Sequence, residues 1–333
     1  MIRPRIAAAL IVRDEARCLK RCLDSVTPWV DRLVVVDTGS TDATPDIARA
    51  CGAEVSDFAW VDDFAAARNH ALALADADWT LIIDADEWIE DGGHRLRDWC
   101  GGSSGIGVVA VDSQTDGAAV QRDWISRVAP RGVRFAGRIH EQIDTELPRI
   151  RCPLVIGHDG YRPECLPAKS ERNRPLLLRA LEDRPDDGYL LAQLGRDADV
   201  GGDPVAANDW YAAALAATPP DANWRHTLVL GAISSLAAVG RLDDAMTLAD
   251  AEFARWQHSP DFFFVLGNLM LDRAVADPTQ AIVEWLPLAQ GAWERCLAIG
   301  DQPLLDGSVA GRGSHLARHN LALIAPMLGQ RVG

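Results

Sequence analysis

A buried strand that ends in acidic residues constrains the fold of this chain more than any other feature. Leu81, Ile82 and Ile83 form an apolar run, which is typical of a strand buried on both faces, as in a parallel sheet. Asp84 and Asp86 follow directly, and residues two apart in an extended chain project to the same side. We therefore expect two carboxylates to converge at the carboxyl end of a buried strand, where open α/β sheets hold their ligands.

Two converging carboxylates repel each other unless a cation lies between them. Carboxylate oxygens suit hard ions such as Mg²⁺ and Mn²⁺, which commonly bridge to substrate phosphates. The alternative is that Asp86 caps a short helix and that Asp84 is a solvated strand end. The pattern of these two residues, taken alone, leaves both interpretations open.

The first half of the chain alternates between strand and helix patterns. Strand-like runs occupy residues 6–12, 33–36, 54–57 and 79–83, and helical patterns separate them, the last with Asp63 as its expected N-cap. This alternation predicts βαβ units and a mainly parallel sheet. Acidic residues follow each strand, namely Asp14, Asp37, Asp57 and the Asp84/Asp86 pair. Acidic residues at every strand end favour a binding cleft over chance helix caps, and the absence of glycine-rich dinucleotide or P-loop motifs weakens those two interpretations. Further strands are expected at 107–111, 121–128 and 133–135, in a mixed edge sheet.

Composition restricts the partners of the chain. Its 333 residues carry a formal net charge of −15, with 48% hydrophobic and 24% charged residues. These proportions supply a sizeable core, while the negative charge argues against nucleic acid or an anionic membrane surface as a partner. The seven cysteines include no CxxC pair, so we expect buried free thiols in a reducing cytosol. No apolar run is long enough to cross a bilayer, and we expect a cytoplasmic protein without a transmembrane segment.

Four short motifs carry a resemblance to a known family. They are Ile-Val-Arg-Asp-Glu at 11–15, Val-Asp-Thr-Gly-Ser-Thr-Asp at 36–42, Ala-Arg-Asn at 67–69 and Asp-Ala-Asp-Glu at 84–87. In this order they resemble a family-2 glycosyltransferase of the GT-A fold. The resemblance implies an α/β GT-A domain, Rossmann-like with a mostly parallel sheet, which we place at residues 1–166.

The resemblance implies a binding site for a nucleotide-sugar donor. Asp37 would bond the nucleobase, most often uracil, while Val12, Arg13 and Asp14 would flank the base and the ribose. Arg68 would reach the nucleotide or its phosphates. The alternative for Arg68 is a solvated helix arginine that pairs with a nearby aspartate.

The same resemblance implies a metal site beside the donor. Asp84 would lie near the ribose or the metal, and Asp86 would be the direct metal ligand. His158 occupies the place where relatives often supply a further ligand, although a lone histidine is more often a packed, hydrogen-bonded residue. An imidazole beside two carboxylates would favour Mn²⁺ somewhat over Mg²⁺. The metal would offset the charge that develops on the diphosphate leaving group.

The segment at 135–141 resembles the acceptor side of the family. Sugar transfer by a single displacement needs a base that takes the acceptor proton, and Glu141 is the candidate. His140 could substitute, because the unperturbed pKa of histidine lies closer to neutrality. The alternative is that both side chains only satisfy buried backbone groups.

Helical repeats are expected after residue 167. Small and large residues between 191 and 219 fit a tetratricopeptide repeat, and a second unit follows at 230–252. Ala207 and Ala245 are 38 residues apart, near the repeat's usual period of about 34. A looser pair at 262–298 and a capping helix at 315–328 would complete an all-α domain at residues 167–333. The alternative is a plain helical bundle with no binding role.

These expectations combine into one main function and two competing ones. Family-2 transferases with such a tail resemble the bacterial peptide S-glycosyltransferases of glycocin pathways, and others act on saccharides. We expect a metal-dependent, inverting glycosyltransferase that uses a UDP-sugar and a peptide or saccharide acceptor, and that could form a homodimer through the helical domain. The main alternative is a non-catalytic scaffold whose repeats bind a protein partner. A nucleotidyltransferase would need a glycine-rich phosphate loop after the first strand, and residues 13–16 contain no glycine.

Overall fold

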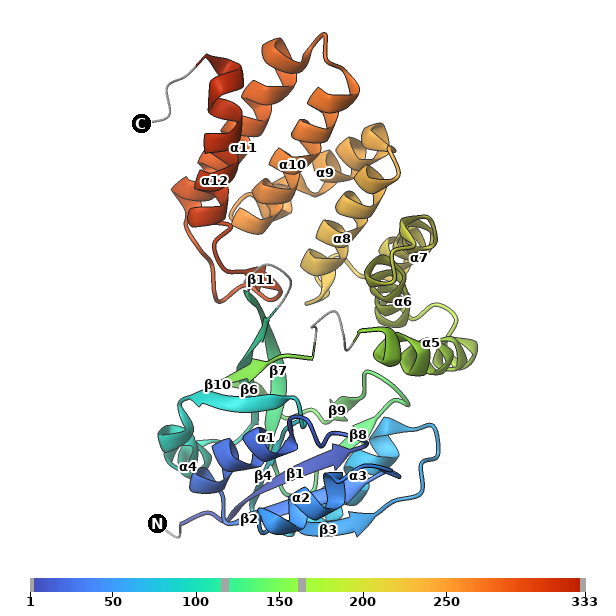
Figure 1. The fold of residues 1–333 in the computed structure, drawn as a ribbon, viewed down its shortest axis with the longest axis vertical. Helices are drawn as coiled ribbons and strands as arrows, with labels where there is room; N and C mark the ends of the chain where they lie inside the picture. Colours follow the sequence, from blue (N-terminus) through green and yellow to red (C-terminus); the bar gives the residue numbers. More distant parts are fainter. Residues whose placement is uncertain (1–2, 115–119, 161–165, 330–333) are drawn as a thin grey trace. The chain divides into compact units, whose positions relative to one another are not determined.

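A mostly parallel sheet followed by a helical region forms this protein, in agreement with the fold class predicted from the sequence (Figure 1). The computed structural model describes residues 3–114, 120–160 and 166–329. The chain divides into two compact units. Unit 1 comprises Met1–Ala118 and Asp123–Leu166, and unit 2 comprises Ala119–Arg122 and Pro167–Gly333.

Eight strands hydrogen-bond in the order β3-β2-β1-β4-β7-β6-β10-β5. They are β1 (Ile6–Val12), β2 (Arg32–Asp37), β3 (Glu54–Asp57), β4 (Trp79–Ile82), β5 (Glu87–Asp91), β6 (Ile106–Gln114), β7 (Val120–Pro130) and β10 (Arg149–His158). The first four strands of the sheet run parallel to one another, and β7 is antiparallel to β4. Strands β6 and β10 are parallel to each other, and β5 is antiparallel to β10. The carboxyl ends of β1, β2 and β4 therefore share one edge.

The strands expected after residue 106 do not form a mixed edge sheet. Strands β6 and β7 lie inside the main sheet, between β4 and β10, and the edge position belongs to β5. The expected strand at 133–135 is β8 (Arg134–Ala136), which pairs only with β9 (Gln142–Asp144) in a separate two-stranded sheet. Strand β5 follows the acidic turn too closely for a sequence pattern to separate it from β4.

Both faces of the parallel strands are covered, as their apolar sequences predict. On one face α1 (Leu19–Val26), α2 (Thr44–Ala50) and α4 (Gly93–Gly102) pack on the large side chains of β1, such as Leu10. On the other face α3 (Phe64–Ala75) lies over Ala7 and Ala9. The small residues of β1 allow α3 to approach the sheet closely, which brings the first half of that helix near the acidic strand ends.

Helix α3 begins where the sequence predicts. The Asp63 carboxylate caps the helix by accepting a hydrogen bond from the Ala66 N–H at 2.9 Å, which satisfies a backbone donor at the open end of the helix. Phe64 also donates its backbone N–H to the carbonyl of Arg138, at 2.8 Å. The start of α3 is therefore fixed both by its own cap and by the segment that precedes β9.

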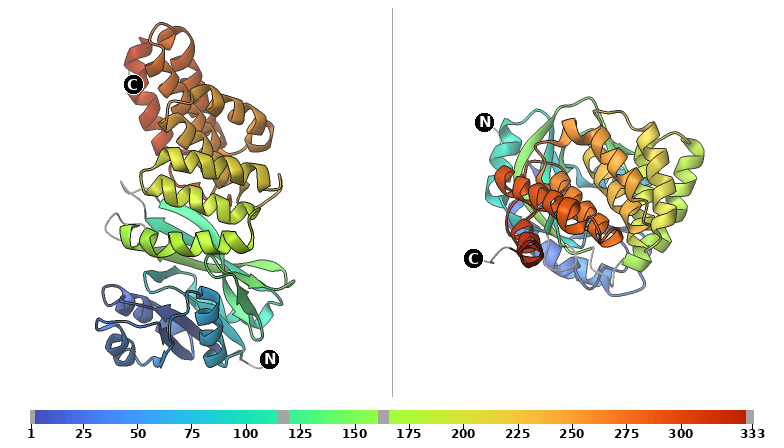
Figure 2. Two further views of the ribbon diagram at one scale, coloured as in Figure 1. Left: turned by 90° about the vertical axis from the view of Figure 1, so that its right-hand side faces the viewer. Right: turned by 90° about the horizontal axis from the view of Figure 1, so that it is seen from above.

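Unit 2 is built from consecutive helices that pack side by side (Figure 2). They are α5 (Leu166–Asp183), α6 (Gly188–Val200), α7 (Pro204–Ala217), α8 (Arg225–Ala238), α9 (Leu242–Trp256), α10 (Pro260–Ala276), α11 (Leu286–Ile299) and α12 (His315–Ile324). The three predicted helix pairs correspond to α6 with α7, α8 with α9, and α10 with α11. Strand β11 (Ser308–Val309) pairs with Arg122 and Gln121 within the same unit.

Glycines allow close helix contacts inside these pairs. A Cβ atom on Gly195 in α6 would lie 2.5 Å from the ring of Tyr211 in α7. In the third pair, a Cβ atom on Gly267 in α10 would lie 2.4 Å from the indole nitrogen of Trp293, which is fully buried in α11. Large rings packed against glycines thus set the spacing of these helices.

The cysteines of the described residues are free, as expected. Five of them are buried and Cys51 is partly buried, while Cys165 lies outside the described residues. Burial raises the pKa of the Cys152 thiol to about 11 and that of Cys100 to about 12, so these thiols are protonated at neutral pH and act as apolar core groups. Within the described ranges, no helix has the length and apolar character needed to cross a membrane.

Substitution of Gly267 tests the helix packing of unit 2. Gly267→Ala should lower the free energy of unfolding by about 1–2 kcal/mol, because the new methyl group overlaps Trp293. The matched control is Gly291→Ala in α11, where a Cβ atom meets nothing within 4 Å, and helix propensity should raise stability by about 0.5–1 kcal/mol. Denaturant titration of both variants measures the difference, and equal stability would contradict the packing described.

Candidate active site

Asp37 ends β2 beside the end of β1, where the register pairs it with Val12. Its Oδ1 atom accepts hydrogen bonds from the N–H groups of Gly39 and Ser40, each at 2.7 Å, in a turn that the φ of +106° at Gly39 permits. Asp37 is 4% exposed, and its buried Oδ2 atom has no hydrogen-bond partner in the part of the chain that the structure describes. An unpaired buried carboxylate oxygen is costly, so a ligand N–H would be a favourable partner for it.

The loop after β1 is tied to the loop after β2. Asp14 has a φ of 55°, donates its N–H to the Ser40 hydroxyl at 2.9 Å, and accepts a hydrogen bond from the Thr41 N–H at 2.7 Å. Arg13 is exposed beside it. The structure thus brings the loop of the predicted Val12–Asp14 segment against the Asp37 loop.

The chain turns after β4 instead of continuing as an extended strand. The Glu87 N–H donates to the Asp84 carbonyl at 3.0 Å, which closes a turn over residues 84–87. The side chains of Asp84 and Asp86 consequently meet different partners. The expectation that both carboxylates converge on one point assumed extended geometry, and this turn corrects it.

Asp84 lies between two buried arginines. Arg68 of α3 donates to its Oδ1 atom and Arg127 of β7 donates to its Oδ2 atom, both at 2.8 Å. Arg127 also binds the Glu87 carboxylate at 2.5 Å, and Arg68 also binds Glu141 through its Nε atom. Both arginines are 8% exposed. The alternative pairing of Arg68 with a nearby aspartate is therefore present, although the arginine is buried rather than solvated.

Arg127 is a site residue that the sequence analysis missed. It lies on β7, whose residues near the sheet centre alternate without a motif, and its partners precede it by about 40 residues in the chain. One signal could have indicated Arg127. It is a basic residue on a strand that pairs with β4, and β4 is followed by acidic residues.

Charge sets the protonation of these carboxyl groups. Burial alone would raise the pKa of Asp84, but the charges of Arg127 and Arg68 more than offset that effect, so its pKa lies well below the usual range. Glu87 behaves oppositely. Its burial raises its pKa, the neighbouring Asp84 charge raises it further, and Arg127 only partly offsets them. Asp84 is consequently the more strongly ionised of the two.

Asp86 faces His158 at the end of β10. The Nε2 atom of His158 lies 3.5 Å from Oδ2 of Asp86, and its Nδ1 atom lies 3.0 Å from the Ser113 hydroxyl oxygen. Two of the three predicted metal ligands are therefore neighbours, while Asp84 is turned to its arginines. No set of three His, Cys, Asp or Glu side chains in the described ranges is arranged to hold a metal ion.

Asp159 contacts the backbone of Asp86, and the sequence analysis did not indicate it as a site residue. It is 1% exposed, accepts hydrogen bonds from Arg17 at 3.3 Å and Arg21 at 3.0 Å, and donates its N–H to the Asp86 carbonyl at 3.3 Å. Burial would raise the pKa of Asp159, but hydrogen bonds from Arg21 and Arg17 lower it overall. Arg21 also stacks on Trp88, 4.1 Å from the ring centre.

Glu141 and His140 lie in the turn between β8 and β9. The side chain of Glu141 is only 10% exposed and binds Arg68, so α3 joins it to Asp84. His140 is partly buried and has a φ of 49°, an uncommon conformation for a residue other than glycine. Glu141 is thus part of the same charge network as Arg68 and Asp84.

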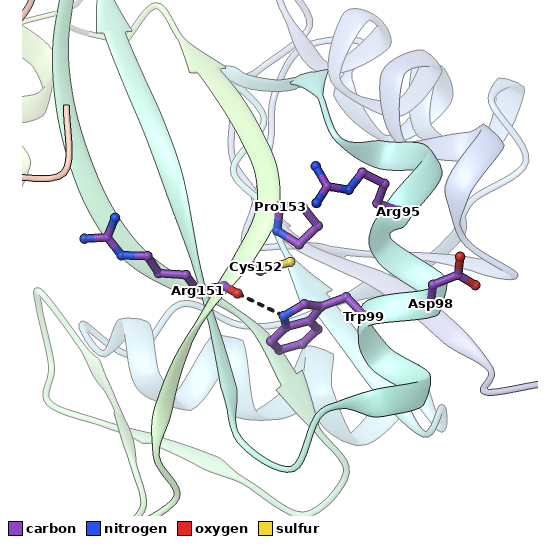
Figure 3. A pocket seen from close by; sticks show the side chains of 6 residues that line it. All are labelled: Arg95, Asp98, Trp99, Arg151, Cys152 and Pro153. Atoms are coloured by element: carbon purple, nitrogen blue, oxygen red, sulfur yellow. Dashed lines mark hydrogen bonds between the residues drawn. The ribbon is translucent and has the colours of Figure 1, made fainter.

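A separate hollow lies on α4 and β10, away from these residues. It has a volume of about 410 Å³ and is lined by Arg95, Asp98, Trp99, Arg151, Cys152 and Pro153 (Figure 3). Trp99 donates its indole N–H to the Arg151 carbonyl at 2.9 Å. The Arg151 guanidinium points away from Trp99 and stacks on Trp124. Arg95 and Arg151 therefore do not converge on a common ligand.

Comparison with known proteins shows that part of unit 1 is similar to a known family. The family described as Glycosyl transferase family 2 matches residues 8–95, which include Asp37, Arg68, Asp84 and Asp86. The chain carries a family 2 glycosyl transferase domain. Arg127, Glu141 and His158 lie outside the matched residues but contact the family 2 domain through Asp84, Arg68 and Asp86, respectively.

Two relatives extend beyond the family 2 domain. Over 241 residues the chain is 36% identical to a TPR repeat-containing protein of Synechococcus elongatus, which covers 68% of this chain and 60% of that protein. Over 209 residues it is 27% identical to the SPbeta prophage-derived glycosyltransferase SunS of Bacillus subtilis, which covers 58% of this chain and 49% of SunS. The chain therefore spans about half to three fifths of the length of these relatives.

Solved structures show a more limited likeness. Glucosyl-3-phosphoglycerate synthase from Mycobacterium tuberculosis, in complex with Mn²⁺, UDP and glucosyl-3-phosphoglycerate, is 27% identical over 33% of this chain and 44% of that chain, with a TM-score of 0.29.

Loss of Arg127 should expose the cost of the buried charges. Arg127→Leu leaves Asp84 and Glu87 without one shared cation, so we expect a loss of about 3 kcal/mol in the free energy of unfolding near pH 7. The control is Arg131→Leu, whose ion pair with Asp76 is exposed and should contribute little to stability because solvent screens it.

The pH dependence of this loss follows from the two pKa shifts. In the wild type, Asp84 with its lowered pKa stabilises the fold above the unfolded value and stops doing so as the pH falls towards the folded value. Without Arg127, both carboxyl groups should take up protons at higher pH in the folded protein. The difference between variant and wild type should therefore shrink as the pH falls from about 7 to about 4, and a difference independent of pH would contradict this account.

Proposed function

We propose that the family 2 domain binds a nucleotide-sugar and transfers its sugar to a hydroxyl or thiol group of a peptide or saccharide. The observation that carries this proposal is the buried Asp37 carboxylate, with one oxygen held by two backbone N–H groups and the other without a partner among the described residues. The match of residues 8–95 to the family supports it, as does the similarity to a glycosyltransferase over 209 residues.

The nucleobase would bind at Asp37. Its Oδ2 atom can accept a hydrogen bond, and the edge of uracil presents an N–H donor that matches it. The loop that contains Val12, Arg13 and Asp14 borders the same place, because Asp14 is bonded to Ser40 and Thr41 of the Asp37 loop. A preformed acceptor selects a base that can donate to it, and among such bases the resemblance to family-2 glycosyltransferases favours uracil.

A divalent cation would be held by Asp86 and His158. Their facing atoms are one carboxylate oxygen and one imidazole nitrogen, a donor set that suits Mn²⁺ as well as Mg²⁺. Ser113 contacts the other imidazole nitrogen and so orients the ring. A bound ion would supply positive charge that stabilises the leaving diphosphate. Asp84, already paired with Arg68 and Arg127, would act by fixing Arg68 near the donor.

Transfer would proceed by single displacement on the acceptor side. The acceptor oxygen or sulfur forms a bond to the anomeric carbon, the bond from that carbon to the diphosphate oxygen breaks, and Glu141 receives the acceptor proton. This sequence inverts the anomeric configuration. Arg68 binds the Glu141 side chain and thereby holds the base in the same network as Asp84. His140, which directly precedes Glu141 in the chain, is the second candidate for the base.

Asp37→Asn tests the nucleotide site directly. The Asn oxygen can still accept the Gly39 and Ser40 N–H groups, but its amide group presents a donor to the donor of the base. We expect the variant to fold normally and to bind UDP about 10- to 150-fold more weakly, which corresponds to about 1.5–3 kcal/mol.

Asp46→Asn is the matched control, because Asp46 lies in α2 with 84% of its side chain exposed. Calorimetric titration with UDP in the presence of Mn²⁺ measures both variants against the wild type. Equal affinity of Asp37→Asn and the wild type would remove Asp37 from the nucleotide site. No binding to any of the three proteins would favour a scaffold in which the helical unit binds a protein partner.

A further inference from the structure

Asn69 makes a two-point contact that the proposed mechanism does not use. Its side-chain N–H donates to the Phe135 carbonyl at 2.9 Å, and its side-chain oxygen accepts the Phe135 N–H at 2.8 Å. The amide therefore pairs with the backbone of β8 as a neighbouring strand would. Among the described residues, β9 is the only strand that pairs with β8, so Asn69 satisfies backbone groups that would otherwise be left at the edge.

Two further contacts from α3 reach the same segment. At the start of the helix, the Phe64 N–H donates to the Arg138 carbonyl at 2.8 Å. One turn later, Arg68 binds the Glu141 carboxylate. Residues 64 and 68 are four apart and lie on the same face of the helix, and Asn69 follows Arg68 directly. The first two turns of α3 therefore contact residues 135, 138 and 141. The helix thus contacts the β8–β9 segment in β8 and at two places in the turn that follows it.

The turn that carries Glu141 needs such support. Gly137 has a φ of 100° and His140 has a φ of 49°, and the second value disfavours a residue with a side chain by about 1 kcal/mol or more. A strained turn keeps its conformation only when its surroundings fix it. Asn69 fixes the backbone of Phe135 at the entrance to this turn, while Arg68 holds the carboxylate at its end.

We propose that Asn69 is a positioning residue that fixes the β8–β9 turn and so places the Glu141 carboxylate for proton transfer from the acceptor. This inference rests on the proposed function, because Glu141 is its base. Asn69 itself touches neither donor nor acceptor in this account. Its loss should therefore leave nucleotide binding unchanged and slow the chemical step, since a small displacement of a reacting group can cost about 100-fold in rate.

Hydrogen exchange in the full-length chain tests the positioning independently of activity. In Asn69→Ala the Phe135 N–H loses its acceptor, so we expect exchange over residues 134–144 to accelerate at least about tenfold while the other strands of unit 1 keep wild-type rates. Asn69→Asp keeps an acceptor for the Phe135 N–H but turns a carboxylate oxygen towards the Phe135 carbonyl, so exchange should accelerate there too, and this variant serves if the alanine variant does not fold. Asn268→Ala is the control, because Asn268 is an exposed helical asparagine in unit 2.

Hydrolysis of a UDP-sugar supplies the second readout, with water as the acceptor and Mn²⁺ present. The probe is whichever of UDP-glucose and UDP-N-acetylglucosamine the wild type hydrolyses faster. Asn69→Ala should lower kcat by about 10- to 100-fold with a KM within about twofold of wild type, and Glu141→Gln should show the same pattern. Asn268→Ala should match the wild type in both constants.

The outcomes separate this proposal from the proposed function. Unchanged exchange over residues 134–144 in Asn69→Ala would overturn the proposal, and so would accelerated exchange with an undiminished kcat. A raised KM with an unchanged kcat would also overturn it, because Asn69 would then act on donor binding. If the wild type hydrolyses neither sugar while exchange accelerates as expected, the proposed function fails and the fixed turn stands as a structural feature.

Discussion

The charge network around Asp84 is the interaction on which the acidic edge of the sheet depends. A partly buried carboxylate at the end of β4 would be unfavourable alone, and Arg68 and Arg127 neutralise it from α3 and β7. Each arginine then binds a second carboxylate, so Glu87 and Glu141 are fixed by the same two cations. Four chain segments are joined in this way by ion pairs and hydrogen bonds with little freedom to move.

This arrangement gives the two halves of the proposed reaction a common frame. In that proposal the donor side would contain Asp37 and the Asp86–His158 pair, and the acceptor side would contain Glu141. Helix α3 lies between them, because Arg68 contacts Asp84 and Glu141 while Asn69 contacts β8. A helix that packs closely on the small residues of β1 is a rigid support for such groups. Geometry that brings a base and a donor together supplies much of the rate enhancement of a displacement reaction.

The sequence predicted what local patterns encode and missed what depends on distant contacts. Apolar runs predicted the parallel strands, the cap at Asp63 predicted the start of α3, and the motifs indicated Asp37 and Arg68. The turn at 84–87 could not be predicted, because the hydrogen bond from Glu87 to Asp84 competes with an extended chain of the same sequence. Arg127, Asp159 and the partner of Asn69 were missed because each meets residues 40 or more positions away.

The central claim is that this edge of the sheet binds a uridine nucleotide together with a divalent cation. Its most direct test is a calorimetric titration of the wild-type chain with UDP and with GDP, each with and without Mn²⁺. The account predicts saturable binding of UDP that Mn²⁺ strengthens at least about tenfold, an effect of about 1.4 kcal/mol, and weaker binding of GDP. Absence of binding by either nucleotide, or affinity for UDP that is the same with and without Mn²⁺, would contradict it.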